Sequence, residues 1–342
     1  MITKTEIAER LGVSRSTVSL VLNRKPDARV SEETRQRVLE AAEKFGYKPE
    51  ETKTQDLICY VLCNRKIDLP HYYEQLRALE QEASDRNFRI VFMTVDHTEE
   101  EYAKMAGILN KPGVKGAVLA GDFNYEITRR IQEIQVPFVA TTGVTYVEGI
   151  NLVTYDHFQA GFEATEYLIK LGHKRIAYFT GELYRLTYSQ ILAGYREAHK
   201  NHGLFFDPAL VQISHAVRGD DLVQRMKELA IDYSAIVTVN EQMGIEALNE
   251  LKTEGRVIPG EVSVIAIGGG HVSQRCKPKL SVMGGGEESM ATLVFDILEK
   301  DINNFNLKPE TAVVKNKLIE RESTGPFMNL KQKYQQNSRI IF

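Results

Sequence analysis

From Leu57 onward the sequence alternates between short apolar runs and longer amphipathic stretches. Runs such as 57–62 and 263–267 have the length of buried strands, and stretches of helical periodicity separate them. Strands that are buried on both faces belong to parallel sheets, whose crossover connections are usually helices. We therefore predict an α/β body built from doubly wound parallel sheets.

The expected elements fall into two blocks, about 57–155 and 156–284, which predict two lobes. The expected strands lie at 57–62, 90–95, 116–120, 138–140, 152–155, 175–180, 210–213, 235–239, 263–267 and 312–315, and the expected helices at 72–86, 99–109, 124–134, 158–171, 188–202, 219–230, 241–254 and 286–300. Ligands of such sheets bind at the carboxyl ends of the strands, so a two-lobed body predicts a ligand cleft between the lobes.

The N-terminal segment has a different pattern and predicts three short helices. Thr3 and Glu6 have the spacing of a capping box, and Gly12 ends the helix that they open. Ser14 opens a second helix, and a third one follows. A close turn between two short helices is typical of a helix-turn-helix, here over 4–23, whose second helix presents polar side chains to a DNA major groove. The alternative is a three-helix packing module without DNA.

Charge is distributed unevenly along the chain. The whole chain has a formal charge of −3, whereas residues 1–49 alone carry +3 and the remainder −6. A small basic head on an acidic body favours a polyanion as the partner of the head. Residues 49–56 (Pro-Glu-Glu-Thr-Lys-Thr-Gln-Asp) have the polar composition of a linker.

Composition argues against several classes of protein. Three cysteines, an odd number, argue against a disulfide framework and for a reducing compartment. The N-terminus has no apolar signal-peptide core, and no apolar stretch reaches the length of about 18 residues that spans a membrane, so a cytoplasmic protein is expected. Metal-ligand spacings and nucleophile motifs are missing, and the glycine triplets 268–270 and 284–286 lack the context of a dinucleotide site. We expect neither an enzyme nor a cofactor.

Residues 7–23, Ile-Ala-Glu-Arg-Leu-Gly-Val-Ser-Arg-Ser-Thr-Val-Ser-Leu-Val-Leu-Asn, resemble the DNA-binding signature of the lactose/galactose repressor (LacI/GalR) family. Body segments such as 171–177 and 318–323 continue the resemblance, which covers residues 2–327. It implies a homodimeric transcriptional regulator of the repressor type that binds a double-stranded DNA operator. It also implies a body similar to periplasmic sugar-binding proteins, with a small effector in the cleft that alters DNA affinity.

These features together predict an all-α head joined to an α/β body of periplasmic-binding-protein type. The expected segments are a helix-turn-helix domain at 1–48, a short atypical linker at 49–56, a two-lobed effector-binding and dimerisation domain at 57–327, and a polar tail at 328–342. Lobe 1 is expected at about 57–155 plus 285–311, and lobe 2 at about 156–284 plus 312–327.

The resemblance also assigns roles to residues of the second helix. It implies that Arg15, Ser16 and Leu20 reach base edges, where an arginine can grip O6 and N7 of guanine and a leucine can touch a thymine methyl. The residues implied to hold phosphates are Ser14, Thr17, Asn23 and Arg24. The alternative for each of them is a solvated helix face.

The linker departs from the family pattern. Relatives place a hinge helix with an Ala-Arg-x-Leu core after the proline, and its leucine enters the minor groove. Here Glu50 and Glu51 follow Pro49, and no such core exists. Because carboxylates are repelled by DNA phosphates, we expect no wedge in the minor groove. A small-molecule-binding protein with weakened DNA binding is therefore the alternative to a regulator, and the linker distinguishes the two.

For the effector cleft the resemblance implies six residues: Tyr72, Tyr73, Asp122, Arg185, Thr187 and Asn240. The two tyrosines would cover an apolar face of the ligand, and Arg185 would bind its oxygens. Where relatives carry Gly-Tyr-Asp-Asp or Gly-Tyr-Asp-Asn, this chain has three glycines at 268–270, so a carboxylate that grips sugar hydroxyls is missing. With Arg185, His271 and Arg275 close in sequence, this favours a sugar phosphate or another anionic, oxygen-rich metabolite over a plain sugar.

Overall fold

The computed structural model of the 342-residue chain describes residues 2–22, 30–47, 55–67, 70–141, 147–304 and 307–328. Two compact units make up the chain, Met1–Gln55 and Asp56–Phe342. Most of the predicted linker and tail lies outside the described residues, as do Asn23 and Arg24, two of the predicted phosphate-binding residues.

The first unit consists of three short helices, α1 (Lys4–Leu11), α2 (Arg15–Leu22) and α3 (Glu32–Lys44). The predicted capping box is present, because the Glu6 amide donates to the Thr3 hydroxyl and the Thr3 amide donates to the Glu6 carboxylate. Gly12 follows α1 with a φ of 65°, a left-handed conformation that glycine adopts without strain. The buried core is formed by Ile7, Ala8, Val18, Val21, Val38, Ala41 and Ala42. These contacts confirm the predicted helix-turn-helix.

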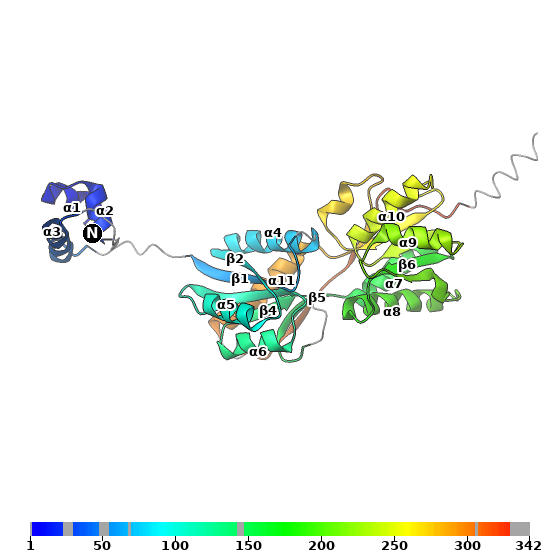
Figure 1. Cartoon of the computed structure of the whole chain (residues 1–342), viewed down its shortest axis with the longest axis horizontal. Helices are drawn as coiled ribbons and strands as arrows, with labels where there is room; N and C mark the ends of the chain where they lie inside the picture. The colour runs from blue at the N-terminus through cyan, green and yellow to red at the C-terminus, as the bar shows by residue number, and fades with distance from the viewer. Residues whose placement is uncertain are drawn as a thin grey trace, which may run out of the picture. The chain divides into compact units, whose positions relative to one another are not determined.

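The second unit contains two six-stranded sheets with helices packed on their faces (Figure 1). Its strands are β1 (Asp56–Cys63), β2 (Phe88–Val95), β3 (Val114–Gly121), β4 (Phe138–Thr141), β5 (Asn151–Tyr155), β6 (Ile176–Thr180), β7 (Val211–Ile213), β8 (Ala235–Thr238), β9 (Ser263–Ile267), β10 (Ser281–Gly284), β11 (Thr311–Val314) and β12 (Lys317–Ile319). Its helices are α4 (Pro70–Asp85), α5 (Glu99–Leu109), α6 (Tyr125–Glu133), α7 (His157–Lys170), α8 (Leu186–Asn201), α9 (Gly219–Glu228), α10 (Glu241–Thr253) and α11 (Glu287–Asn303), with short 3-10 turns at Pro208–Leu210 and His271–Gln274.

The first sheet is parallel throughout and has the strand order β11-β5-β4-β3-β1-β2. Alternate side chains of β1 enter two separate apolar clusters, Ile58, Tyr60 and Leu62 on one face and Cys59, Val61 and Cys63 on the other. Helices α4 and α11 cover the first of these faces, and α5 and α6 cover the second. A strand covered on both faces needs apolar side chains on both, which explains the uninterrupted run at 57–62.

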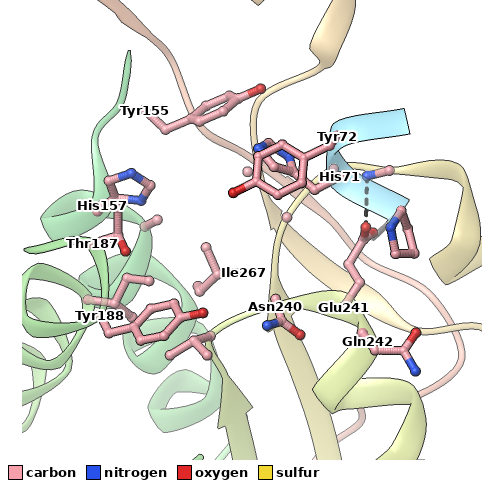
Figure 2. A pocket seen from close by; sticks show the side chains of 18 of the residues that line it. His71, Tyr72, Tyr155, His157, Thr187, Tyr188, Asn240, Glu241, Gln242 and Ile267 are labelled. Atoms are coloured by element: carbon pink, nitrogen blue, oxygen red, sulfur yellow. Dashed lines mark hydrogen bonds between the residues drawn. The ribbon is translucent and has the colours of Figure 1, made fainter. Parts of the chain in front are cut away.

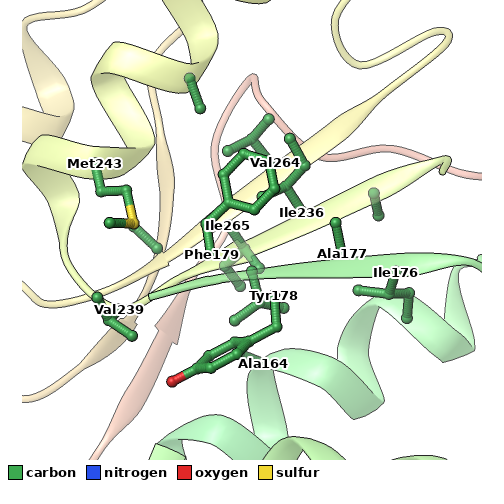
Figure 3. Packing of buried hydrophobic residues seen from close by; sticks show 14 of the residues in the cluster. Ala164, Ile176, Ala177, Tyr178, Phe179, Ile236, Val239, Met243, Val264 and Ile265 are labelled. Atoms are coloured by element: carbon green, nitrogen blue, oxygen red, sulfur yellow. The ribbon is translucent and has the colours of Figure 1, made fainter. Parts of the chain in front are cut away.

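The second sheet has the order β12-β10-β9-β8-β6-β7 and is parallel except for β12. Helices α7 and α8 lie on one face, and α9 and α10 lie on the other. Figure 3 shows how β6 serves both faces, because Tyr178 points toward the helix of Ala164 while Phe179 points away from it. The two sheets with their helices confirm the predicted two-lobed α/β body.

The chain crosses between the lobes three times, after β5, β10 and β11. Strand β11 pairs with β5 in the first sheet, so the prediction that residue 312 begins the second lobe is wrong, and the chain returns there only with β12. Strands β10 and β12 were not predicted, because β10 has only two large apolar residues, Val282 and Met283, and the three residues of β12 are exposed. Residues of all three crossovers, His157, Gly285 and Asn316 among them, line one cavity.

Candidate functional site

The second helix of the head presents its N-terminal turn to solvent. The side chains of Ser14, Arg15 and Ser16 are exposed, and those of Thr17 and Leu20 are partly buried. On the opposite side of the helix, buried Val18 and Val21 hold it against α1 and α3. The predicted base-contacting residues of α2 therefore lie on one side of a helix whose other side packs against the core of the head. A helix presented in this way can enter a DNA major groove.

Ser14, a predicted DNA contact, also caps the N-terminus of α2. Its hydroxyl accepts the Thr17 amide at 3.0 Å and lies 2.7 Å from Ser16 Oγ and 2.8 Å from Thr17 Oγ1. Such a cap stabilises the start of a helix by about 1 kcal/mol. The hydroxyl cluster therefore orders the first turn of α2, the same turn that carries Arg15.

A cavity of about 380 Å³ lies in the second unit, where the strands of both lobes end (Figure 2). Asp122 follows β3 of the first lobe, whereas Asn240 follows β8 and Gly268 follows β9 of the second. The carboxyl ends of parallel strands are where doubly wound sheets bind ligands. The cavity thus lies at the position that the sequence predicts for a ligand cleft.

Five of the six predicted cleft residues line the cavity: Tyr72, Asp122, Arg185, Thr187 and Asn240. The sixth, Tyr73, leaves 59 % of its surface exposed and is not part of the lining. Consecutive residues of a helix point about 100° apart, so only one of two neighbouring tyrosines can face the cleft. In Figure 2, Tyr72 from the first lobe and Tyr188 from the second both point into the cavity. Burial raises the pKa of Tyr72 to about 12, so its hydroxyl remains a donor.

Asp122 of the first lobe binds two arginines, one from each lobe. Its carboxylate accepts Nη1 and Nη2 of Arg185, from the second lobe, at 3.0 and 3.3 Å. It also pairs with Nη2 of Arg65, from the first lobe, at 2.8 Å. Partial burial opposes the charge of Arg185, but the bond to Asp122 outweighs it and raises the pKa of Arg185. A ligand oxygen at Arg185 must therefore share this guanidinium with Asp122.

Three further carboxylates line the cavity, those of Glu74, Glu241 and Glu287. Glu74, from the first lobe, accepts the amide of His271, from the second, at 2.8 and 3.0 Å. Glu241 accepts the Gly270 amide at 3.2 Å, and a Cβ at Gly270 would clash with the oxygens of both Glu74 and Glu241. The glycines at 268–270 therefore leave room for carboxylates from other elements, and the cleft does not lack acidic groups.

The basic groups near these carboxylates differ from those that the sequence suggested. The ring of His71 lies 3.1 Å from the Glu287 carboxylate. Burial opposes the imidazolium, but the charge of Glu287 outweighs it and raises the pKa of His71. His271 and Arg275, which favoured an anionic ligand at the sequence level, are not part of the cavity lining.

Several buried polar atoms on the cavity wall have no hydrogen-bond partner among the residues that the structure describes. They are Arg65 Nε, Tyr155 Oη, both ring nitrogens of His157, Glu241 Oε1, Glu287 Oε2 and Asn316 Oδ1. Leaving a buried polar group unpaired costs about 1–3 kcal/mol. Burial, reinforced by the nearby His71, lowers the pKa of His157 to about 4, so its neutral ring offers one donor and one acceptor. The set indicates a site that a polar ligand completes.

The two glycine triplets pack against each other beside the crossovers. A Cβ at Gly284 would clash with the carbonyl oxygen of Gly268, and one at Gly269 with that of Gly285. Only glycine permits this close approach of two backbones. The triplets therefore join the strand ends of the second lobe to a crossover, and their role is packing at the edge of the cleft.

Four charged lining residues are absent from the sequence-based prediction: Arg65, Glu74, Glu241 and Glu287. Arg65 and Glu241 come within three residues of the ends of β1 and β8, and strand-end position is a signal that could have found them. Glu74 lies within α4, and Glu287 begins α11. The sequence gives no comparable signal for these two, because the folding of the lobes brings them to the cleft.

In the described part of the chain, no group of three His, Cys, Asp or Glu side chains is arranged to hold a metal ion. None of the helices within the described ranges is long and apolar enough to cross a membrane. All three cysteines are free, and Cys59 and Cys63 are fully buried in the core around β1.

Two family models match the chain over most of its length. The model described as periplasmic binding proteins and sugar binding domain of LacI family matches residues 55–273, and the model of bacterial regulatory proteins, lacI family, matches residues 3–50. The HTH-type transcriptional regulator CelR of Thermobifida fusca is 28 % identical, over 93 % of this chain and 96 % of its own length. The catabolite control protein A of Priestia megaterium is 24 % identical, over 94 % and 99 %.

Solved structures show the same similarity. A complex of the transcriptional regulator CelR with cellobiose has a TM-score of 0.69 and 28 % identity, and the match covers 94 % of this chain and all of that one. A lac repressor dimer bound to operator and the anti-inducer ONPF has a TM-score of 0.70 at 20 % identity, covering 95 % of this chain and 99 % of that one, a likeness of fold alone.

Proposed function

This chain belongs to the LacI family of bacterial regulatory proteins, and from this premise we propose that it is a sequence-specific transcriptional repressor whose operator affinity a small effector controls. The observation that carries the proposal is the combination of two sites in one chain. The head holds an exposed helix end with Arg15 and Ser16, and the body holds a cavity with unpaired polar atoms from both lobes. We place the protein in the cytoplasm, where its three free cysteines stay reduced.

The two lobes supply the means of control. Asp122 and Arg185 bridge the cleft at 3.0 Å, and Glu74 bridges it again through the His271 amide. A ligand shifts an open–closed balance only if it binds the two states differently. A ligand that competes for Arg185 while contacting the first lobe has this property, so effector binding changes how the lobes are held.

The comparisons support a polar effector and a dimer. The similar CelR structure is a complex with cellobiose, and the similar lac repressor structure is a dimer on its operator. We propose that this chain likewise acts as a homodimer on a two-fold symmetric site. Within its cleft, Tyr72, Asp122, Arg185, Thr187 and Asn240 are the proposed effector-binding residues, and Tyr73 is no longer among them.

The first test concerns DNA. We expect Arg15→Ala to weaken binding to an operator selected in vitro by about 1–3 kcal/mol and to relax one base position, because a bidentate contact to guanine is lost. Fluorescence anisotropy on the selected operator and on random DNA measures both effects. An equal loss on the two DNAs would show that Arg15 contacts phosphate instead.

The second test concerns the effector. A thermal-shift screen of sugars, sugar phosphates, amino sugars and nucleotides identifies a ligand, since binding stabilises the folded state by mass action. We expect Arg185→Ala to abolish the thermal shift and the ligand's effect on operator binding. Asp122 keeps Arg65 as a partner, so the fold should tolerate the change. Arg129→Ala, on an exposed face of α6, is the control. A response like that of the unmodified protein would contradict the site.

A small-molecule-binding protein with weakened DNA binding remains the second candidate, because the linker carries Glu50 and Glu51 in place of basic residues. The same operator selection decides between them, since a chain of this second kind enriches no DNA sequence.

A further inference from the structure

The charged groups of the cavity fall into two sets. One set, the arginine pole, consists of Arg65, Arg185 and the Asp122 carboxylate that both of them bind. The other set, the carboxylate pole, consists of Glu74, Glu241 and Glu287. The two poles place different demands on a ligand, because one offers donors and the other acceptors.

At the arginine pole the carboxylate of Asp122 offsets one of the two guanidinium charges and is shared by both arginines. Asp122 receives three contacts of 3.3 Å or less from the two guanidinium groups, and all three side chains expose no more than 24 % of their surface. One buried donor, Arg65 Nε, is left without a partner among the described residues. Neutral ligand oxygens, such as hydroxyls, are sufficient to satisfy this donor.

At the carboxylate pole the compensation is incomplete. Of the described basic side chains, only His71 comes within ion-pair distance of any of the three carboxylates, at 3.1 Å from Glu287. Glu74 accepts the backbone amide of His271, and Glu241 accepts that of Gly270 and lies next to the Ser273 hydroxyl. Glu241 and Glu287 begin α10 and α11, where a helix N-terminus favours an ionised carboxylate, whereas burial raises the pKa of Glu241. Three carboxylates therefore face His71 and the more distant Arg321, so acidic groups are in excess at this pole.

The acceptors of this pole also lack donors. Glu241 Oε1 and Glu287 Oε2 are buried and have no partner within the described chain. His157, at the start of α7 in the second lobe, also lines the cavity and has both ring nitrogens unpaired within the described chain. These atoms come from both lobes, so a group that satisfies them contacts both, which is the condition for an effector that controls closure.

An ammonium group meets both demands at once. It donates three hydrogens and brings a positive charge, whereas a hydroxyl donates one hydrogen and leaves the charge uncompensated. Resting on the proposed function, in which this cleft is the effector site, we propose that the effector is a polyhydroxylated amine of the amino-sugar class. Its ammonium binds the carboxylate pole, its hydroxyls bind the arginine pole, and Tyr72 and Tyr188 flank the ring.

Matched sugar pairs test the charge. The full-length protein is titrated calorimetrically at pH 7 with D-glucosamine and with the β-1,4-linked glucosamine disaccharide. Their neutral twins are D-glucose, N-acetylglucosamine, cellobiose and the N-acetylated disaccharide, and glucose 6-phosphate is the anionic probe. We expect at least one amine to bind tenfold or more tightly than its neutral twins, and glucose 6-phosphate to bind more weakly. Tighter binding of a neutral or anionic twin, or no binding of either amine at millimolar concentration, overturns the assignment.

Glutamine variants locate the ammonium. Glu241→Gln and Glu287→Gln should each weaken binding of the amine tenfold or more and leave binding of the neutral twin within twofold. Glu288→Gln, whose carboxylate is 71 % exposed beside Glu287 and outside the cavity lining, should change neither. Operator binding is followed in the same samples. If a neutral or anionic sugar is the compound that alters operator affinity, the amine assignment fails while the proposed function stands; if no compound alters it, effector control itself fails.

Discussion

His157 is a buried titratable residue of the cleft whose protonation affects the stability of the fold. Its ring is buried beside the first crossover, both nitrogens lack a partner among the described residues, and its pKa is lowered to about 4. As pH falls below the ordinary value of about 6.5, the unfolded chain therefore takes up a proton before the folded chain does. This group stabilises the folded state above pH 6.5, and the contribution is lost between pH 6.5 and 4.

We expect His157→Gln to make the free energy of unfolding depend less on pH between pH 6.5 and 4. The unmodified protein should lose roughly 2–3 kcal/mol from this group between pH 6.5 and 4, and the variant should not. Urea unfolding of the full chain, followed by circular dichroism at several pH values, measures the difference. His215→Gln is the control, because the His215 side chain is 88 % exposed. Equal pH slopes for His157→Gln and the unmodified protein would show that His157 is solvated in the folded state.

A cleft residue could be predicted from the sequence where its position relative to a strand determines its location in the fold. Asp122 and Asn240 follow strands, so the topology alone brings them to the ligand edge of a sheet. The pairing of Asp122 with Arg185 could not be read from the sequence, because it depends on how the two lobes face each other. The same holds for Glu74, a residue within a helix whose partner His271 is 197 positions away.

Among elements, those with a clear apolar or helical pattern were predicted, the three-residue strand β7 included, whereas β10 and β12 were missed. The helices and the strands with buried runs lie close to their predicted ranges, because burial on both faces imposes an apolar run on β1 or β9. Strand β12 has three exposed residues, so neither length nor apolar pattern marks it. Helix α2 begins where the Ser14 cap predicts, since a cap is a local interaction.

The contact between the ends of β9 and β10 gives a prediction at the scale of elements. Gly284→Ala places a methyl group against the Gly268 carbonyl, so the strand ends must separate. We expect a loss of about 1–3 kcal/mol in stability and a weaker effector response, because the crossover after β10 shifts. Gly107→Ala in α5 has open space around its Cβ and should be neutral or stabilise by up to about 1 kcal/mol. Urea unfolding and effector titration compare the two. Unchanged stability of Gly284→Ala would mean that the backbones separate without cost.

At the scale of the whole molecule, a basic head and an acidic body are joined by an acidic connection. Residues 1–49 carry +3 and the remainder −6, and most of the linker lies outside the described residues. Affinity for DNA must therefore come from the head, while the body contributes control through its cleft. The composition of the linker determines whether a contact in the minor groove adds to the DNA affinity of the head.

The last prediction concerns this linker. Glu50 and Glu51 occupy the sequence positions where relatives have a basic hinge helix, and carboxylates close to phosphates are repelled. We expect the protein to bend a selected operator far less than relatives that insert a leucine wedge, as measured by circular-permutation gel shifts. Replacing Glu50 and Glu51 with glutamine should raise operator affinity at low salt and have little effect at high salt, because the repulsion is screened. A large central kink by the unmodified protein would contradict the prediction and would mean that another segment enters the minor groove.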